Sequence, residues 1–408
     1  MKNAIISVSI YALLSACSQF SDEQPSHASG ISAPENFFPA NIASASPEVS
    51  HEISRNILQQ KHLFEHFWKN PLPRDFNLTA ALNSSATVNS TTHSFIGDLP
   101  NESRCPTADL SFEMNTRTSG FDPNNAYWAM WLSRTIQMDE SSILDRMLTI
   151  PTEESHLITR GILGLQAGVF RIDGKVFVTF RGTQDIADYI QNAFIDTVPG
   201  ESAGLPGRVH QGFRDNFLAL WQEVYDTAIS MGAAETGVWL MGHSLGGVLS
   251  TFSAYNFVER NIAVHGVYEF GSPLPGNELF QKAYNARLGD RTFIIGYESD
   301  ITPHVPPLPD AAESFSNVVR PELKALAKIL THNLNYRQVG SWYTLKRDGL
   351  LQKVENLADF QNRYYNKMRA DNEKNSLPTL LFTNRRYTHD HETEYYHCGM
   401  RGFVTRQH

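Results

Sequence analysis

The sequence contains few cysteines, no run of basic residues and no grouping of Cys and His at the spacing of a metal site. Only three of its 408 residues are cysteines. The net charge is −9, and a chain without a basic patch lacks the electrostatic footprint of a nucleic-acid-binding protein. We therefore expect no nucleic-acid partner, no metal and no other cofactor.

The apolar run at the N-terminus is too short for a membrane span. It extends from Ala4 to Leu14 and follows Lys2, whereas a helix that crosses a bilayer needs about 20 apolar residues. A positive charge followed by a short apolar segment is typical of a secretory signal peptide. We expect residues 1–16 to be such a peptide and the protein to be exported.

The end of this run has a second feature. Leu14-Ser15-Ala16-Cys17 resembles the lipobox of bacterial lipoproteins, whose cysteine is diacylated and becomes the first residue of the mature protein. The resemblance implies that Cys17 holds the protein at a membrane surface, and Ser18 at the next position favours the outer membrane. The alternative is an ordinary signal peptide in which Cys17 has no role.

The other two cysteines, Cys105 and Cys398, lie near the two ends of the region expected to fold. Export to an oxidising compartment would allow them to form a disulfide. The sequence does not show that they are close in space, so two free thiols remain the alternative.

Composition indicates one folded domain behind a long N-terminal segment. From Cys17 to about residue 50 the chain is rich in Ser, Pro, Asn and Ala, and such a segment cannot bury enough apolar surface to offset its ordering entropy. We interpret residues 17–104 as a tether with one short helix at 53–68. Residues 105–408 are then the folded domain.

Helical and strand patterns alternate within this domain. Helical spacing predicts helices at 125–136, 210–231 and 248–260. β-rich runs predict a hairpin at 168–180, with its turn at Asp173-Gly174, and strands at 237–241, 264–270 and 291–297. The alternation predicts an α/β fold whose mostly parallel sheet is covered by helices on both faces.

The strongest sign of chemistry is Gly242-His243-Ser244-Leu245-Gly246, between a predicted strand and a predicted helix. Small residues beside a serine permit a cramped strand-to-helix turn that exposes the hydroxyl. The turn also brings the N–H of Leu245 to the helix N-terminus, where a developing oxyanion is stabilised. Ser244 is therefore the candidate nucleophile. The alternative is a glycine-rich turn with an unimportant serine.

A nucleophilic serine requires a base and a carboxylate that orients the base, and in this type of fold they follow in the order Ser, acid, His. Asp300 comes directly after the predicted strand 291–297. Because the carboxyl ends of parallel strands meet at one rim of the sheet, we expect Asp300 on the same rim as Ser244. Glu298 is the weaker alternative.

Five blocks, in this order along the chain, resemble the class 3 lipases, a family of fungal triacylglycerol lipases, phospholipases and feruloyl esterases. They are Val178–Thr183, Val209–Phe213, Gly242–Gly247, Phe270–Asn277 and Asp300–Pro307. The resemblance covers roughly residues 120 to 400. It implies an α/β-hydrolase fold and hydrolysis of a carboxylic ester of a lipid, foremost an acylglycerol. The alternatives are a phospholipase A1 or feruloyl-type esterase with the same triad, and a catalytically silent lipid-binding protein.

The resemblance also implies roles for individual residues. In the family the residue after Phe-Arg-Gly supplies the second oxyanion donor, which assigns this role to Thr183. A short mobile lid follows that donor, and residues 185–195 carry an apolar helical face that suits a lid. An ordinary amphipathic core helix is the alternative for 185–195.

The catalytic histidine of the family often follows an aspartate and precedes an aromatic residue. Three histidines occur late in the chain, His389, His391 and His397. Asp390-His391 with Tyr395-Tyr396 downstream fits this pattern best, so His391 is the expected base. His389 and His397 remain open as alternatives.

Two further helical segments follow the candidate acid. Residues 323–330 form an insert that compact members of the family lack, and this insert either shapes the acyl pocket or a membrane-facing surface, or is a packed surface helix. Residues 357–372 are heavily charged, and we expect a helix there that is simply solvated.

Overall fold

The computed structural model describes residues 111–115, 120–160, 165–182, 197–318, 331, 334–371 and 390–407. The chain divides into two units, Met1–Thr91 and Thr92–His408, and every described residue belongs to the second. The expected signal peptide, the tether with its helix at 53–68, Cys17 and Cys105 therefore lie outside the described residues, as do Thr183, the expected lid and the insert at 323–330. Within the described ranges, no helix is both long and apolar enough to cross a membrane.

Within the described ranges, the central sheet has eight strands in the order β1-β2-β3-β6-β7-β9-β11-β12. Their bounds are β1 Thr152–Arg160, β2 Leu165–Ile172, β3 Lys175–Phe180, β6 Val238–His243, β7 Val264–Phe270, β9 Thr292–Tyr297, β11 Ser341–Leu345 and β12 Leu351–Val354. The five strands from β3 to β11 are parallel, and antiparallel strands extend the sheet at both edges. The expected mostly parallel α/β sheet is thereby confirmed, and β2 and β3 form the expected hairpin.

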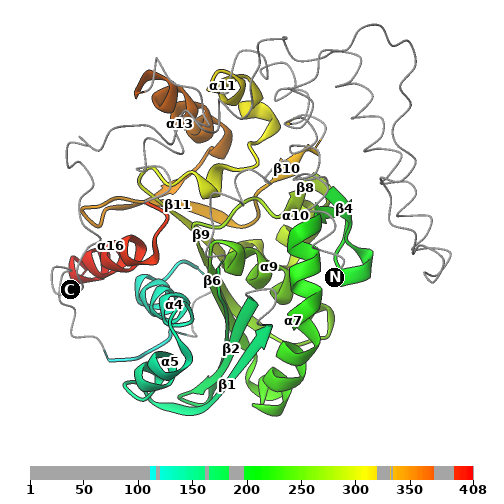
Figure 1. Ribbon diagram of the computed structural model, residues 1–408, viewed down its shortest axis with the longest axis vertical. Helices are drawn as coiled ribbons and strands as arrows, with labels where there is room; N and C mark the ends of the chain where they lie inside the picture. Colours follow the sequence, from blue (N-terminus) through cyan, green and yellow to red (C-terminus); the bar gives the residue numbers. More distant parts are fainter. Residues whose placement is uncertain are drawn as a thin grey trace, which may run out of the picture. The chain divides into compact units, whose positions relative to one another are not determined.

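Helices cover both faces of the sheet (Figure 1). One face carries α4 (Pro123–Thr135), α5 (Glu140–Met147) and α16 (Thr393–Thr405), and the other carries α7 (Gln211–Ser230), α9 (Leu245–Glu259) and α10 (Glu278–Leu288). Phe177 and Trp239 point to the core on the α4 side, whereas Val178 and Leu240 belong to the core under α9. Strands buried on both faces are apolar almost throughout, which explains why β3, β6 and β7 read as continuous apolar runs.

The part of the unit that the structure describes also contains a small second sheet and several short elements. The sheet has the order β10-β8-β5-β4, with β10 Tyr336–Arg337, β8 Gly276–Asn277, β5 Arg208–His210 and β4 Thr197–Pro199. The other helices of the described residues are α8 Ala233–Thr236, α11 Ala312–Ser316 and α13 Leu357–Asp371, with 3-10 turns at Glu201–Ala203, Gly289–Arg291, Thr302–His304 and Pro309–Ala311.

The structure corrects two details of the sequence interpretation. The helix expected from residue 248 begins at Leu245, because the turn at Ser244 leads directly into the first helical turn. The expectation that 357–372 is simply solvated was wrong, since α13 buries Gln361, Tyr365 and Met368 on one face. That face packs against a third apolar cluster, which includes Ile301, Val305 and Phe315.

Candidate active site

Ser244 occupies a sharp turn between β6 and α9. Its φ of 57° and ψ of −129° lie in a region that non-glycine residues rarely adopt, and such strain persists where the surroundings enforce it. A Cβ on Gly246 would lie 2.1 Å from the carbonyl oxygen of Phe180, so the turn can approach β3 only with glycine there. The Ser244 N–H donates to the Phe270 carbonyl at 2.8 Å, which fixes the turn to the end of β7.

The backbone N–H that the sequence predicts as an oxyanion donor, that of Leu245, lies directly after this turn. Leu245 is the first residue of α9, so its N–H belongs to the first-turn donors that a helix leaves unpaired, at the positive end of the helix dipole. Gly182, the residue before Thr183, also lies close to the turn: a Cβ on it would be 3.1 Å from the Ser244 Cβ. The role of Thr183 itself stays a prediction.

Asp300 and His391 form a buried pair. His391 Nδ1 lies 2.8 Å from Asp300 Oδ2, and the side chains are 7% and 0% exposed. The other carboxylate oxygen, Oδ1, accepts a hydrogen bond from the Thr302 N–H at 2.8 Å. Because both oxygens are held, the carboxylate can orient the imidazole ring.

The pair lies beside the serine turn. A Cβ on Gly271, the residue after Phe270, would be 2.8 Å from Asp300 Oδ2 and 3.0 Å from the His391 ring. The rings of His243 and His391 are 4.3 Å apart between centroids. The structure therefore brings Ser244, Asp300 and His391, which are far apart in sequence, to one rim of the sheet.

The second nitrogen of His391, Nε2, is buried and has no hydrogen-bond partner among the described residues. Nδ1 faces a carboxylate, so in the neutral ring it carries the proton, and this tautomer is assigned from the hydrogen bond. Nε2 then carries a lone pair and can accept a proton from a hydroxyl group.

The alternative residues are placed differently. Glu298 accepts a hydrogen bond from the Arg347 N–H at 2.5 Å in an exposed position, and His397 stacks on Tyr127 with ring centroids 5.8 Å apart. His389 lies outside the described residues. Of the described candidates, Asp300 and His391 are the acid and imidazole that meet.

Two residues at this site were not assigned a role from the sequence. The Tyr396 hydroxyl donates to Asp300 Oδ2 at 2.6 Å, and Asp390 Oδ2 accepts a hydrogen bond from the Ser299 N–H at 3.0 Å. In the sequence, both residues belong only to the pattern that indicates His391 as the base. No periodicity connects them with residues 299 and 300, so only the fold could identify these contacts.

Burial sets the charge state of several groups near the site. Burial, and secondarily the neighbouring His391, holds the pKa of His243 well below its usual value. Burial likewise lowers the pKa of His304 to about 3. Burial raises the pKa of Glu269 to about 7. The two histidines are therefore neutral at ordinary pH, which suits them to packing.

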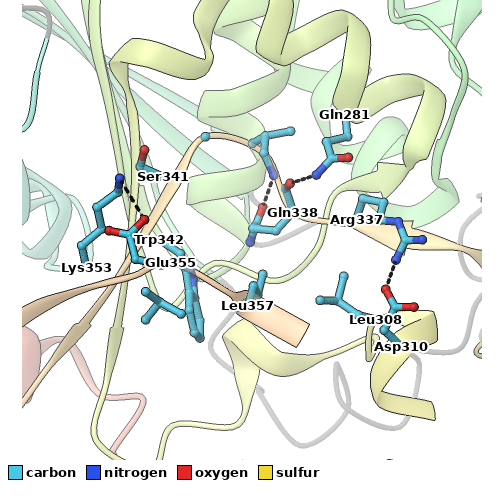
Figure 2. Close-up of a pocket in the computed structure, with 13 residues that line it drawn as sticks. Gln281, Leu308, Asp310, Arg337, Gln338, Ser341, Trp342, Lys353, Glu355 and Leu357 are labelled. Atoms are coloured by element: carbon cyan, nitrogen blue, oxygen red, sulfur yellow. Dashed lines mark hydrogen bonds and ion pairs between the residues drawn. The ribbon is translucent and has the colours of Figure 1, made fainter. Parts of the chain in front are cut away.

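A cavity of about 440 Å³ lies away from these residues, where β10, β11, β12 and the start of α13 meet. Figure 2 shows its charged side chains, and the ion pairs Arg337–Asp310 and Lys353–Glu355 each have an N–O distance of 3.4 Å. Neither Ser244 nor His391 lines it. Its rim of paired charges does not suit an acyl chain.

Cys398, on α16, is disulfide-bonded. The described ranges contain no second cysteine. Its pairing with Cys105 stays a prediction.

Comparison with known proteins identifies similar enzymes. Residues 177–309 match the family model described as Lipase (class 3), a stretch that includes Ser244 and Asp300. Lipase ZK262.3 of Caenorhabditis elegans is 30% identical over 135 residues, which are 32% of this chain and 38% of the relative. Phospholipase A1-II 1 of Oryza sativa subsp. indica is 26% identical over 162 residues, 33% of this chain and 40% of the relative.

A third relative is named as a secreted enzyme. The secreted mono- and diacylglycerol lipase LIP4 of Malassezia restricta is 27% identical over 143 residues, 32% of this chain and 47% of the relative. The chain thus spans less than half the length of each of these relatives. Among solved structures, a fungal lipase–inhibitor complex has a TM-score of 0.45 at 19% identity, covering 57% of this chain and 84% of that one.

Proposed function

We propose that this protein is a serine hydrolase that cleaves carboxylic esters of lipids, with acylglycerols as the substrate class. The observation that carries the proposal is the 2.8 Å hydrogen bond between His391 and Asp300 beside the strained turn at Ser244. A serine on such a turn, an imidazole with a free nitrogen and a buried carboxylate are the parts that acyl transfer requires. The match of residues 177–309 to class 3 lipases supports the same reaction.

In the proposed mechanism Ser244 attacks the ester carbonyl while His391 Nε2 takes its proton, and Asp300 stabilises the imidazolium. The N–H groups of Leu245 and Thr183 stabilise the tetrahedral oxyanion, and removing one such donor raises the barrier by about 3 kcal/mol. His391 returns the proton to the leaving alcohol. Water, activated by His391, then hydrolyses the acyl-enzyme and restores the free serine.

Phospholipase A1 activity is the second candidate function. The similarity to the rice phospholipase A1 favours it, and the same residues would carry the reaction. Only the group attached to the acyl chain differs between the two substrates. A direct comparison of an acylglycerol with a phospholipid therefore distinguishes the two activities.

We also propose that the protein is exported and held at the bacterial outer membrane by a lipid on Cys17. Residues 17–104 would form the tether and residues 105–408 the catalytic domain. The N-terminal sequence supports this, and a similar lipase is named as secreted. Mass spectrometry of the N-terminal peptide should find a diacylated Cys17, and an unmodified cysteine inside a longer mature chain would contradict the proposal.

The reaction is tested with a substrate panel. Full-length protein in detergent is assayed on p-nitrophenyl esters from acetate to palmitate, on a triacylglycerol and on a phosphatidylcholine. We expect wild-type activity, and a loss of several orders of magnitude in Ser244→Ala and in His391→Ala. The chain-length profile and the preferred lipid then define the substrate.

His389→Ala is the matched control for the base. Retained activity in this variant supports His391, whereas loss in His389→Ala alone would move the base by two residues. A folded wild-type protein that hydrolyses none of these esters would contradict the proposed function.

A further inference from the structure

Helix α13 packs over the segment that follows the candidate acid, next to α11 (Figure 1). Three of its side chains bond to the main chain of residues 299–308. The Tyr364 hydroxyl donates to the Ser299 carbonyl at 2.8 Å, the Tyr365 hydroxyl donates to the His304 carbonyl at 2.5 Å, and Gln361 Oε1 accepts from the Leu308 N–H at 2.9 Å. The inward polar groups of α13 are therefore hydrogen-bonded to the backbone of residues 299–308, the acid loop.

Ring stacking reinforces these bonds. The ring of Tyr364 lies on that of His304, with centroids 3.7 Å apart and planes at 11°. Phe360, one turn earlier on α13, is also stacked on His304, at 5.8 Å. His304 is buried and neutral, so it presents an aromatic surface to the helix.

Ser299 is held from two sides. Its carbonyl accepts from Tyr364 on α13, and its N–H donates to Asp390 at 3.0 Å. Asp390 directly precedes His391, and Ser299 directly precedes Asp300. Two adjacent hydrogen bonds therefore join the acid loop to residues 390–391, which carry the candidate base. They are Ser299–Asp390 and Asp300–His391.

A helix that served packing alone would bury aliphatic side chains. Instead, the half-buried Tyr364 bonds to the residue directly before Asp300. The buried Tyr365 and Gln361 bond to residues four and eight positions after it. We propose that Tyr364 is a positioning residue for Asp300, which keeps the carboxylate aligned with His391 through the Ser299 carbonyl. This inference rests on the proposed function.

The proposal predicts a specific kinetic signature for Tyr364→Phe, which keeps the ring and removes one hydroxyl. Loss of one neutral hydrogen bond corresponds to a decrease of about 3- to 10-fold in kcat. KM should change less than about 2-fold, because the hydroxyl that is removed bonds to the Ser299 carbonyl and not to a group with a proposed role in substrate binding. A less well placed carboxylate stabilises the imidazolium less than a well placed one does. The acid limb of the kcat/KM profile should therefore move to lower pH.

The experiment compares full-length wild type with Tyr364→Phe and with two control variants. Tyr365→Phe removes the neighbouring hydroxyl of α13, which bonds four residues beyond Asp300. Tyr225→Phe removes a hydroxyl from α7, where the ring packs on Trp221 and Phe257. Each protein is titrated with a fluorophosphonate to count active serines, its thermal unfolding is recorded, and kcat per active serine is measured across pH on a soluble p-nitrophenyl ester.

A decrease in kcat per active serine together with a shifted acid limb, in Tyr364→Phe but in neither control, supports the proposal. An unchanged pH profile, or the same effect in Tyr365→Phe, would overturn it. Tyr364→Trp, which keeps an aromatic ring at this position and adds no titratable group, is the second variant if Tyr364→Phe does not fold, and the same criteria apply. Absence of labelling in folded wild type would instead overturn the proposed function, so the two failures are distinguishable.

Discussion

The Tyr396 hydroxyl donates to Oδ2 of Asp300 at 2.6 Å, the same oxygen that lies 2.8 Å from Nδ1 of His391. The Tyr396 oxygen also accepts a hydrogen bond from the Tyr297 N–H at 3.0 Å, which fixes its direction. Burial, and then the charge of Asp300, raise the pKa of Tyr396 well above its usual value. Tyr396 therefore remains a protonated donor and holds the carboxylate in its orientation.

Removing this donor should lower the rate without unfolding the protein. A hydrogen bond to a charged group contributes about 1.5–3 kcal/mol, so Tyr396→Phe should lower kcat by roughly 10- to 100-fold and leave KM nearly unchanged. The control is Tyr395→Phe, which removes the hydroxyl of the neighbouring tyrosine on α16, whose ring packs on Tyr297. Equal kcat values for the two variants would show that the Tyr396–Asp300 contact does not support catalysis.

A methyl group at Gly271 should displace the acid and the base. A Cβ there would lie 2.8 Å from Asp300 Oδ2 and 3.0 Å from the His391 ring, at a φ of +58°. Since a displacement of about 1 Å at a reacting group costs about 100-fold in rate, Gly271→Ala should lose at least that factor in kcat/KM. The matched control is Gly174→Ala: the φ there is +70°, and an added Cβ would meet no atom of the described residues within 4 Å. Gly174→Ala should lose some stability but keep its activity, and an equally active Gly271→Ala would contradict the placement of the pair.

Glu269 should make stability depend on pH. Its carboxyl is buried, accepts a hydrogen bond from the Thr251 hydroxyl, and has its pKa raised by burial from 4.5 to about 7. Between these values the unfolded chain ionises while the folded protein retains the proton. The free energy of unfolding therefore falls as pH rises from 4.5 to 7, by about 3 kcal/mol in total.

Glu269→Gln should remove that dependence, because the amide keeps an acceptor for Thr251 and does not ionise. The measurement is urea unfolding of both proteins at pH 4.5, 6 and 8. We expect the unfolding free energy of Glu269→Gln to increase relative to that of the wild type as pH rises. A difference that does not change with pH would mean that Glu269 is not protonated in the folded protein.

The disulfide of Cys398 should connect α16 to Cys105. A non-reduced proteolytic digest analysed by mass spectrometry should contain one cross-linked peptide with these two cysteines. Because a disulfide restricts the unfolded chain, Cys398→Ser should also lower the melting temperature. Detection of Cys105 as a free thiol would contradict the predicted pairing.

Local patterns explain how much of this site could be predicted from the sequence. Consecutive residues form the strand, the turn at Ser244 and the helix that follows, so a local pattern predicts all three. Asp300 likewise comes directly after a strand that its apolar run predicts. The contacts of Tyr396 with Asp300 and of Asp390 with Ser299 join residues 96 and 91 positions apart. Neither composition nor spacing encodes such pairs, so only the folded chain reveals them.

The error at α13 has a different cause. Its charged residues suggested a solvated helix, yet Gln361 is fully buried. A hydrophobic pattern cannot detect a helix whose buried face carries Gln and Tyr bonded to a loop. Such a face becomes visible only when the loop, here residues 299–308, is in place.

The central claim is that Ser244 is the nucleophile of an acyl-transfer triad. It is tested most directly by reacting the full-length protein with a fluorophosphonate and locating the adduct by mass spectrometry. We predict a single adduct on Ser244, absent in Ser244→Ala and formed at least 100-fold more slowly in His391→Ala. An adduct on a different serine, or none on folded wild-type protein, would contradict the claim.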